Sequence, residues 1–82
     1  MKLGWKKPHG MFTSHKLELF RNPTRKSESL FLDYNYLDTY SIDDNVKCPS
    51  GWYCVEVSGK KGYVRLDHRM QLVEEINVEA ID

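Results

Sequence analysis

The sequence predicts an all-β protein built as one small barrel of five or six short strands. Five Tyr, three Phe and two Trp among 82 residues favour strands over helices. Several short segments alternate apolar and polar side chains, and polar turn segments separate them. No helical period extends over ten residues. A barrel is the simplest architecture for such strands, because closure removes exposed strand edges.

The chain is expected to fold as one domain with two flanking segments. Glycine and proline interrupt residues 1–14, which predicts an N-terminal arm or a loose edge strand. Trp5, Met11 and Phe12 are too apolar for a free tail, so we expect them to pack on the barrel or on a partner. The barrel is expected over residues 15–73. Residues 74–82 are expected to form an acidic tail or one added strand.

The first half of the barrel is predicted from three segments. Residues 16–20 alternate, with Leu17 and Leu19 on one face, and a polar loop containing Asn-Pro follows. Strands are expected at 30–32 and 36–42 on composition. In the second of these, Tyr40 and Ile42 are expected to face the core.

The second half is predicted from a hairpin. Residues 52–57 alternate, so that Val55 and Val57 face one side and Trp52 the other. Ser58-Gly59-Lys60 predicts a tight turn, in which Gly59 can adopt a positive φ. Residues 62–65 return as the partner strand. A short 3₁₀ turn is expected within 66–70, and a last strand at 71–73.

The charge balance gives a net charge of zero but an uneven distribution. Residues 1–29 carry seven Lys or Arg against two Asp or Glu, whereas residues 70–82 carry four acids and no base. Ordinary solvated surface explains such a pattern, and so does contact with a charged partner. One such partner is a second copy, in which the basic arm of one subunit meets the acidic tail of the next.

The cysteines and histidines predict neither a metal site nor a cofactor. Cys48 and Cys54 have a C-x5-C spacing that matches no zinc pattern. Two free thiols are expected ahead of a disulfide, and a metal held with His9, His15 or His68 is the least favoured alternative. Neither an apolar segment of membrane-spanning length nor a secretory signal is recognisable, so a cytoplasmic location is expected.

Catalytic motifs are not recognisable in the sequence. Neither G-x-S-x-G, nor a phosphate-binding loop, nor H-E-x-x-H occurs. Cys54 with a neighbouring histidine is the nearest approach to a nucleophile, but nothing in the sequence lowers its pKa. We therefore expect a binding module rather than an enzyme.

Two segments resemble the bacterial SH3-like domain family. L-E-L-F-R-N-P-T stands at 17–24, and G-W-Y-C-V-E-V-S-G-K-K-G-Y-V stands at 51–64. The first departs from the family pattern, because Phe20 replaces the usual Arg and Asn22 the usual Gly. The resemblance, which extends from Leu17 to Val73, implies a half-open barrel with a shallow binding groove. Members bind cell-wall peptides, other proteins or occasionally nucleic acid.

The resemblance also implies candidate partner-binding residues at that groove. They lie in the first loop, before the fourth strand and around the 3₁₀ turn: Trp52, Phe20, Arg21, Arg65 and His68. We expect Trp52 to be exposed and to anchor a partner, with packing beneath the N-terminal arm as the alternative. For Arg65 and His68 the alternative is simple solvation.

Three functions follow as hypotheses. The first is a module that binds a partner protein, such as an inhibitor or adaptor encoded by a phage or another mobile element. The second is nucleic-acid binding, in which aromatic stacking combines with a rim of basic residues. That rim would comprise Lys6, Lys7, Lys16, Arg21, Arg25, Lys26, Lys60 and Lys61. The third is the cell-wall peptide binding that the resemblance implies.

Overall fold

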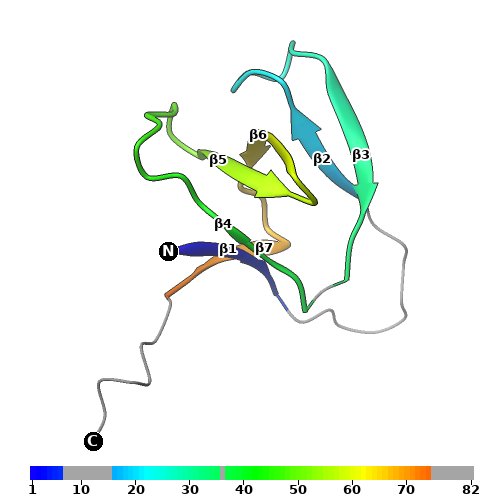
Figure 1. Cartoon of the computed structure of the whole chain (residues 1–82), viewed down its shortest axis with the longest axis vertical. Helices are drawn as coiled ribbons and strands as arrows, with labels where there is room; N and C mark the ends of the chain where they lie inside the picture. Colours follow the sequence, from blue (N-terminus) through cyan, green and yellow to red (C-terminus); the bar gives the residue numbers. More distant parts are fainter. Residues whose placement is uncertain (7–15, 36, 75–82) are drawn as a thin grey trace, which may run out of the picture.

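The computed structural model describes residues 1–6, 16–35 and 37–74, which form two antiparallel sheets. The four-stranded sheet has the order β3-β2-β6-β5, and the three-stranded sheet has the order β4-β1-β7 (Figure 1). The strands are β1 (Lys2–Trp5), β2 (Lys16–Phe20), β3 (Ser29–Asp33), β4 (Thr39–Ser41), β5 (Trp52–Val57), β6 (Lys60–Arg65) and β7 (Met70–Val73). The described residues contain no helix, which confirms the all-β prediction.

Strand β1 corrects the expectation of an N-terminal arm or edge strand. Lys2–Trp5 is the central strand of its sheet, because it pairs with β4 on one side and with β7 on the other. Leu3 is fully buried and Trp5 is 6% exposed. The folded unit therefore includes the start of the chain and has a seventh strand. The expectations for Met11, Phe12 and the tail from residue 75 lie outside the described residues.

The β5–β6 hairpin forms as predicted and extends two residues further than expected. Val57 pairs with Lys60 across a two-residue turn, in which Ser58 and Gly59 have φ values of 51° and 79°. Positive φ at both positions is the type I′ geometry that suits the right-handed twist of a hairpin. This turn fixes the register in which Val55 and Val57 face the core.

Two other predicted elements are shorter in the structure than expected. Strand β4 covers only Thr39–Ser41 of the expected 36–42, although Tyr40 is buried and Ile42 packs against the core as predicted. In place of the expected 3₁₀ turn there is a single hydrogen-bonded turn, in which the Met70 amide donates to the Asp67 carbonyl at 3.1 Å.

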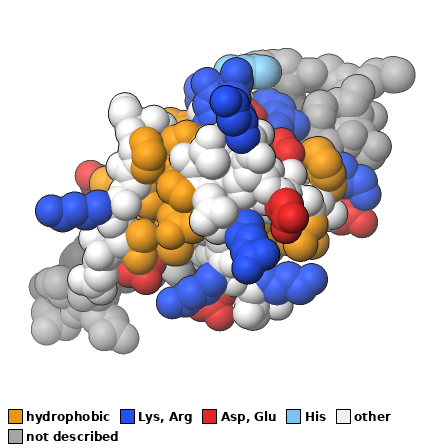
Figure 2. Space-filling model, turned by 90° about the horizontal axis from the view of Figure 1, so that it is seen from above, with side chains coloured by type: hydrophobic (Ala, Val, Ile, Leu, Met, Phe, Trp, Pro, Cys, Tyr) orange, Lys and Arg blue, Asp and Glu red, His pale blue; other side chains and the backbone are white. Residues whose placement is uncertain are grey.

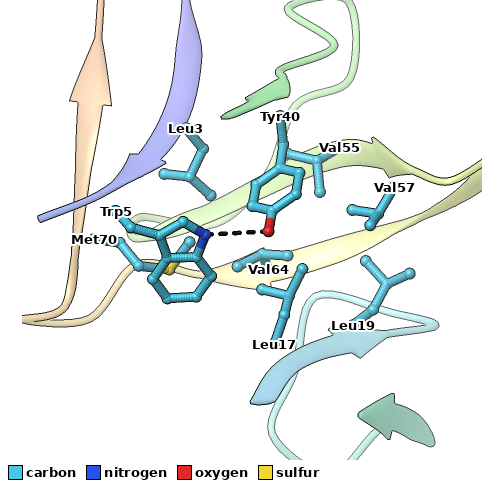
Figure 3. Close-up of a cluster of buried hydrophobic side chains, with 9 residues drawn as sticks. All are labelled: Leu3, Trp5, Leu17, Leu19, Tyr40, Val55, Val57, Val64 and Met70. Carbon is cyan, nitrogen blue, oxygen red and sulfur yellow. Dashed lines mark hydrogen bonds between the residues drawn. The ribbon is translucent and has the colours of Figure 1, made fainter. Parts of the chain in front are cut away.

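The core lies between the two sheets and contains a buried side chain from every strand except β3, whose partly buried Leu32 packs against it. Figure 3 shows these side chains converging, with a hydrogen bond between Trp5 and Tyr40. The buried residues of the cluster are Leu3, Trp5, Leu17, Leu19, Tyr40, Val55, Val57, Val64 and Met70.

The two sheets are joined along one side only. Ile42 and Val55 form an isolated antiparallel bridge that connects the end of β4 to β5. Strands β3 and β7 are the outer strands, and no pairing joins them among the described residues. Over residues 1–6, 16–35 and 37–74 the two sheets therefore do not close, so the expected closed barrel is not confirmed.

Candidate functional site

A groove of about 340 Å³ lies between β2 and the connection from β6 to β7. Its apolar lining comes from both sheets and consists of Trp5, Leu17, Phe20, Val64 and Met70. All of these side chains are less than a tenth exposed, so the floor of the groove is the outer surface of packed side chains. Charged side chains form the rest of the lining: Glu18, Arg25, Arg65, Asp67 and Arg69.

The groove exists because β2 and β6 separate. Phe20 and Tyr63 are the only residues that pair between these strands in the described chain. The next hydrogen-bonded pair in the same register, two residues along, would be Glu18 with Arg65, and both line the groove instead.

Hydrogen-bond alternation in the flanking hairpins shows which backbone groups face the groove. The Arg21 amide donates to the Glu28 carbonyl, so Glu18 turns its N–H and C=O away from β3. The Leu66 amide donates to the Gly51 carbonyl, so Arg65 turns its own groups away from β5. Both walls of the groove thus present main-chain donors and acceptors.

Trp5 is held by contacts from three directions. Its indole Nε1 donates to the Tyr40 hydroxyl at 3.1 Å. The Tyr34 ring stacks on it, with centroids 3.6 Å apart and planes 7° apart. The Arg69 guanidinium lies 5.7 Å from the ring centroid, within cation–π range. This aromatic group fixes one end of the groove.

Asp67 and Arg69 form a closed ion pair at the rim. Arg69 Nη2 lies 2.9 Å from Asp67 Oδ2, and the Arg69 amide donates to Oδ1 at 2.7 Å. Burial would raise the pKa of Asp67, but the bonds and charge of Arg69 outweigh it and hold that pKa below its ordinary value. The Asp67 hydrogen bond in turn raises the pKa of Arg69. These two charges satisfy each other.

The other rim charges are differently placed. Among the described residues neither Arg25 nor Arg65 has an ion pair, and both side chains are exposed. Glu18 accepts a hydrogen bond from the Ser29 hydroxyl at 2.6 Å. The groove therefore has an excess of basic side chains at its rim.

Trp52 is not the exposed anchor that the sequence suggested. It is 9% exposed and lies outside the groove, so the expectation of exposure is wrong. Its ring packs edge-to-face on Phe20, with centroids 5.0 Å apart. Trp52 is covered because β5 is buried on both faces: Cys54, which lies on the same face as Trp52, is buried as well. Phe20 lines the groove from its other side.

The remaining predicted residues are divided between two places. Arg65 lines the groove and is the cross-strand neighbour of Trp52. His68 is exposed in the neighbouring turn and does not line the groove. Arg21 lies at a second, more open hollow of about 490 Å³, together with Leu30, Lys60 and Lys61. The structure thus brings Phe20 and Arg65 to one site and leaves Arg21 and His68 outside it.

Sequence reasoning missed Trp5, Asp67 and Arg69 as site residues, and it named Arg25 only as one of eight basic residues in a possible nucleic-acid-binding rim. For Trp5 the sequence held one signal: the side chain is too apolar for a free tail, which indicated that it packs against something. Nothing local to Arg25 distinguishes it from the other basic residues of its loop.

The described residues offer no evident chemistry for a metal or a nucleophile. They contain no group of three or more His, Cys, Asp or Glu that is placed to hold a metal ion. Cys48 and Cys54 are both free thiols, as expected. Burial raises the pKa of the Cys54 thiol, and Asp43 adds to the rise, which is opposite to what a reactive thiolate needs. Within the described chain no helix has the length and apolar character to span a membrane.

No family model, curated protein or solved structure matches this chain.

Proposed function

We propose that this chain is a non-enzymatic binding module with the fold of a half-open SH3-like barrel. It binds an extended segment of a partner protein. The groove between β2 and the β6–β7 connection is the proposed site. The observation that carries the proposal is the separation of β2 from β6. It leaves an apolar floor between two walls whose groove-facing backbone groups have no partner within the described part of the chain.

The backbone of the walls suits a ligand in extended conformation. Glu18 and Arg65 face the groove with main-chain N–H and C=O groups, and a peptide between them would pair as an added strand. Leu17, Val64 and Met70 beneath them would receive an apolar side chain of that peptide.

The rim defines the charge of the preferred ligand. Arg25 and Arg65 are exposed and lack an ion pair within the described chain, whereas Asp67 and Arg69 neutralise each other. Figure 2 shows one face of the molecule, on which apolar side chains are surrounded by side chains of both charges, Lys and Arg as well as Asp and Glu. Arginine binds carboxylates with two parallel hydrogen bonds. We therefore propose a partner segment that carries an apolar side chain flanked by Asp or Glu.

The experiment starts from peptides selected against the folded protein in a random peptide display library. Amide chemical shifts of the labelled protein are then followed by NMR as a selected peptide is added. Support for the proposal is a set of shifts confined to Glu18, Val64, Arg65 and the turn at 67–70. Shifts confined to the hollow around Lys60 and Lys61 would contradict it.

Matched charge reversals test the rim. Arg25→Glu combined with Arg65→Glu should weaken peptide binding by roughly tenfold or more, mainly through a slower association rate. Lys26→Glu combined with Lys47→Glu is the control, because both lysines are exposed, line neither hollow and change the net charge by the same amount. An equal loss in the control would show general charge attraction instead.

The same measurement separates the protein ligand from nucleic acid. A single-stranded thymidine oligonucleotide should bind weakly, since the aromatic floor of the groove is buried rather than exposed for base stacking. Oligonucleotide binding tighter than that of the selected peptides, with a steep salt dependence, would overturn the proposal. An inhibitor or adaptor that acts in the cytoplasm, encoded by a phage or another mobile element, is the biological role that we propose for such a module.

A further inference from the structure

Strand β3 is an edge strand with no second pairing partner among the residues that the structure describes. Figure 1 shows it along the outer side of the four-stranded sheet, where it pairs only with β2. Its sequence, Ser-Leu-Phe-Leu-Asp, contains neither lysine nor proline. Those residues are the usual protection of an edge strand against pairing with another chain.

The exposed apolar side chains of β3 lie on both faces of the sheet. Phe31 is 62% exposed and lies opposite Glu18 in β2. Leu30 is 43% exposed and lies opposite the core residue Leu19, on the other face. A ligand that covers only one face leaves the other side chain in water, whereas an added strand contacts both.

The pairing with β2 determines which backbone groups point outward. Because Arg21 and Glu28 share a hydrogen bond, Leu30 and Leu32 direct their N–H and C=O groups to β2. Ser29, Phe31 and Asp33 therefore direct theirs to the free edge. None of these outward groups has a backbone partner within the described residues.

This edge is complementary to itself. In an antiparallel pair with a two-fold axis at Phe31, Phe31 lies opposite Phe31 of the second copy, and Ser29 lies opposite Asp33 of the second copy. Every outward N–H then meets an outward C=O. Leu30 comes to lie beside Leu32 of the second copy, and no two like charges are opposite each other. A shift of one residue would present inward-facing groups and place apolar side chains on the wrong faces.

We propose that two copies of this chain associate through their β3 strands into one continuous eight-stranded sheet. The dimer leaves the groove at the other side of β2 free, so it is independent of the proposed peptide binding.

The test is the mass in solution from about 10 µM to about 1 mM, by light scattering or sedimentation, because dimer formation depends on concentration. The protein should approach twice its chain mass of 9.7 kDa at the upper end. Phe31→Lys should remain monomeric throughout, because it places two positive charges opposite each other at the axis. Leu37→Lys is the matched control, since Leu37 is 73% exposed and lies outside every strand. It should dimerise like the parent.

A second variant and a second readout keep the test independent of folding. Phe31→Pro removes an outward N–H without removing a bond to β2, so it should also be monomeric while the β2–β3 pairing persists. Hydrogen exchange should show concentration-dependent protection of Ser29, Phe31 and Asp33 but not of Leu30 and Leu32. A parent protein that stays monomeric at the highest concentration would overturn the proposal. A dimer that persists in Phe31→Lys would also overturn it. So would a dimer that dissociates when salt is added, because that behaviour would indicate contact between the basic end of one copy and the acidic end of another.

Discussion

Replacing Tyr40 by phenylalanine tests the buried side-chain hydrogen bond between the neighbouring strands β1 and β4. The Tyr40 hydroxyl accepts the indole hydrogen bond of Trp5 at 3.1 Å, and both residues are only 6% exposed. The substitution keeps the ring and its edge-to-face contact with Trp5, whose centroid lies 6.3 Å away. It removes the acceptor and leaves a buried N–H without a partner.

The magnitude follows from that unpaired donor. A buried donor that loses its acceptor costs about 1–3 kcal/mol, because it has given up water without a replacement. The lower half of this range applies, since burial of the Tyr40 hydroxyl also carries a desolvation cost that phenylalanine avoids. We expect the free energy of unfolding to fall by about 1–2 kcal/mol and the melting temperature by roughly 5–15 °C.

The assay is urea denaturation of four proteins: the parent, Tyr40→Phe, Trp5→Phe and the double variant. Because both single changes remove the same hydrogen bond, the double variant should be less destabilised than the sum by about 1 kcal/mol. A Tyr40→Phe variant as stable as the parent would refute the reasoning. So would strict additivity in the cycle, because the two groups would then act independently.

Three further outcomes are expected. Gly62→Ala should lower the free energy of unfolding by about 1–3 kcal/mol. A Cβ at this position would lie 2.5 Å from Leu19 Cγ and 2.9 Å from the Phe20 carbonyl oxygen. An unchanged melting temperature would contradict so close an approach of β6 to β2. Trp52→Ala should lower the free energy of unfolding by about 3–5 kcal/mol, because its ring is buried against another aromatic ring; loss of peptide binding with unaltered stability would instead restore it as a surface anchor. Stability should be constant between about pH 6 and pH 9 and should fall above pH 10. Burial raises the pKa of Tyr34 and of Tyr40 in the folded state, so the unfolded chain ionises first. A denaturation midpoint that rises between pH 9 and 11 would contradict this sign.

Alternation in the sequence was sufficient to predict the strands of the hairpins. Residues 16–20 and 52–57 are strands with the predicted bounds, and Leu17, Val55 and Val57 face the core as their spacing indicates. A period of two is a local property, since successive side chains of a strand point to opposite faces whatever lies around them. The turn at Gly59 was predictable for a similar reason, because positive φ is a property of the residue itself.

Burial on both faces of a strand was not predictable in this way. Trp52 lies on the face of β5 opposite Val55, and alternation alone assigns such a side chain to solvent. Phe20 covers it only because β2 is placed beside β6 by a single pair at Tyr63. The partner face of a strand depends on which distant element packs on it, and the local sequence does not encode that.

The role of the first residues was decided by the tertiary structure for the same reason. Lys2–Trp5 has glycine within it and no clean alternation, yet it pairs with strands that begin more than 30 residues later. Sequence composition by itself determined that this chain folds as short strands with a compact apolar core. The positions of the groove and of the free β3 edge followed only from the pairing of strands distant in sequence. Pairing free energies between distant strands depend on the whole register and on the faces that become buried, whereas periodicity reports only on neighbours along the chain.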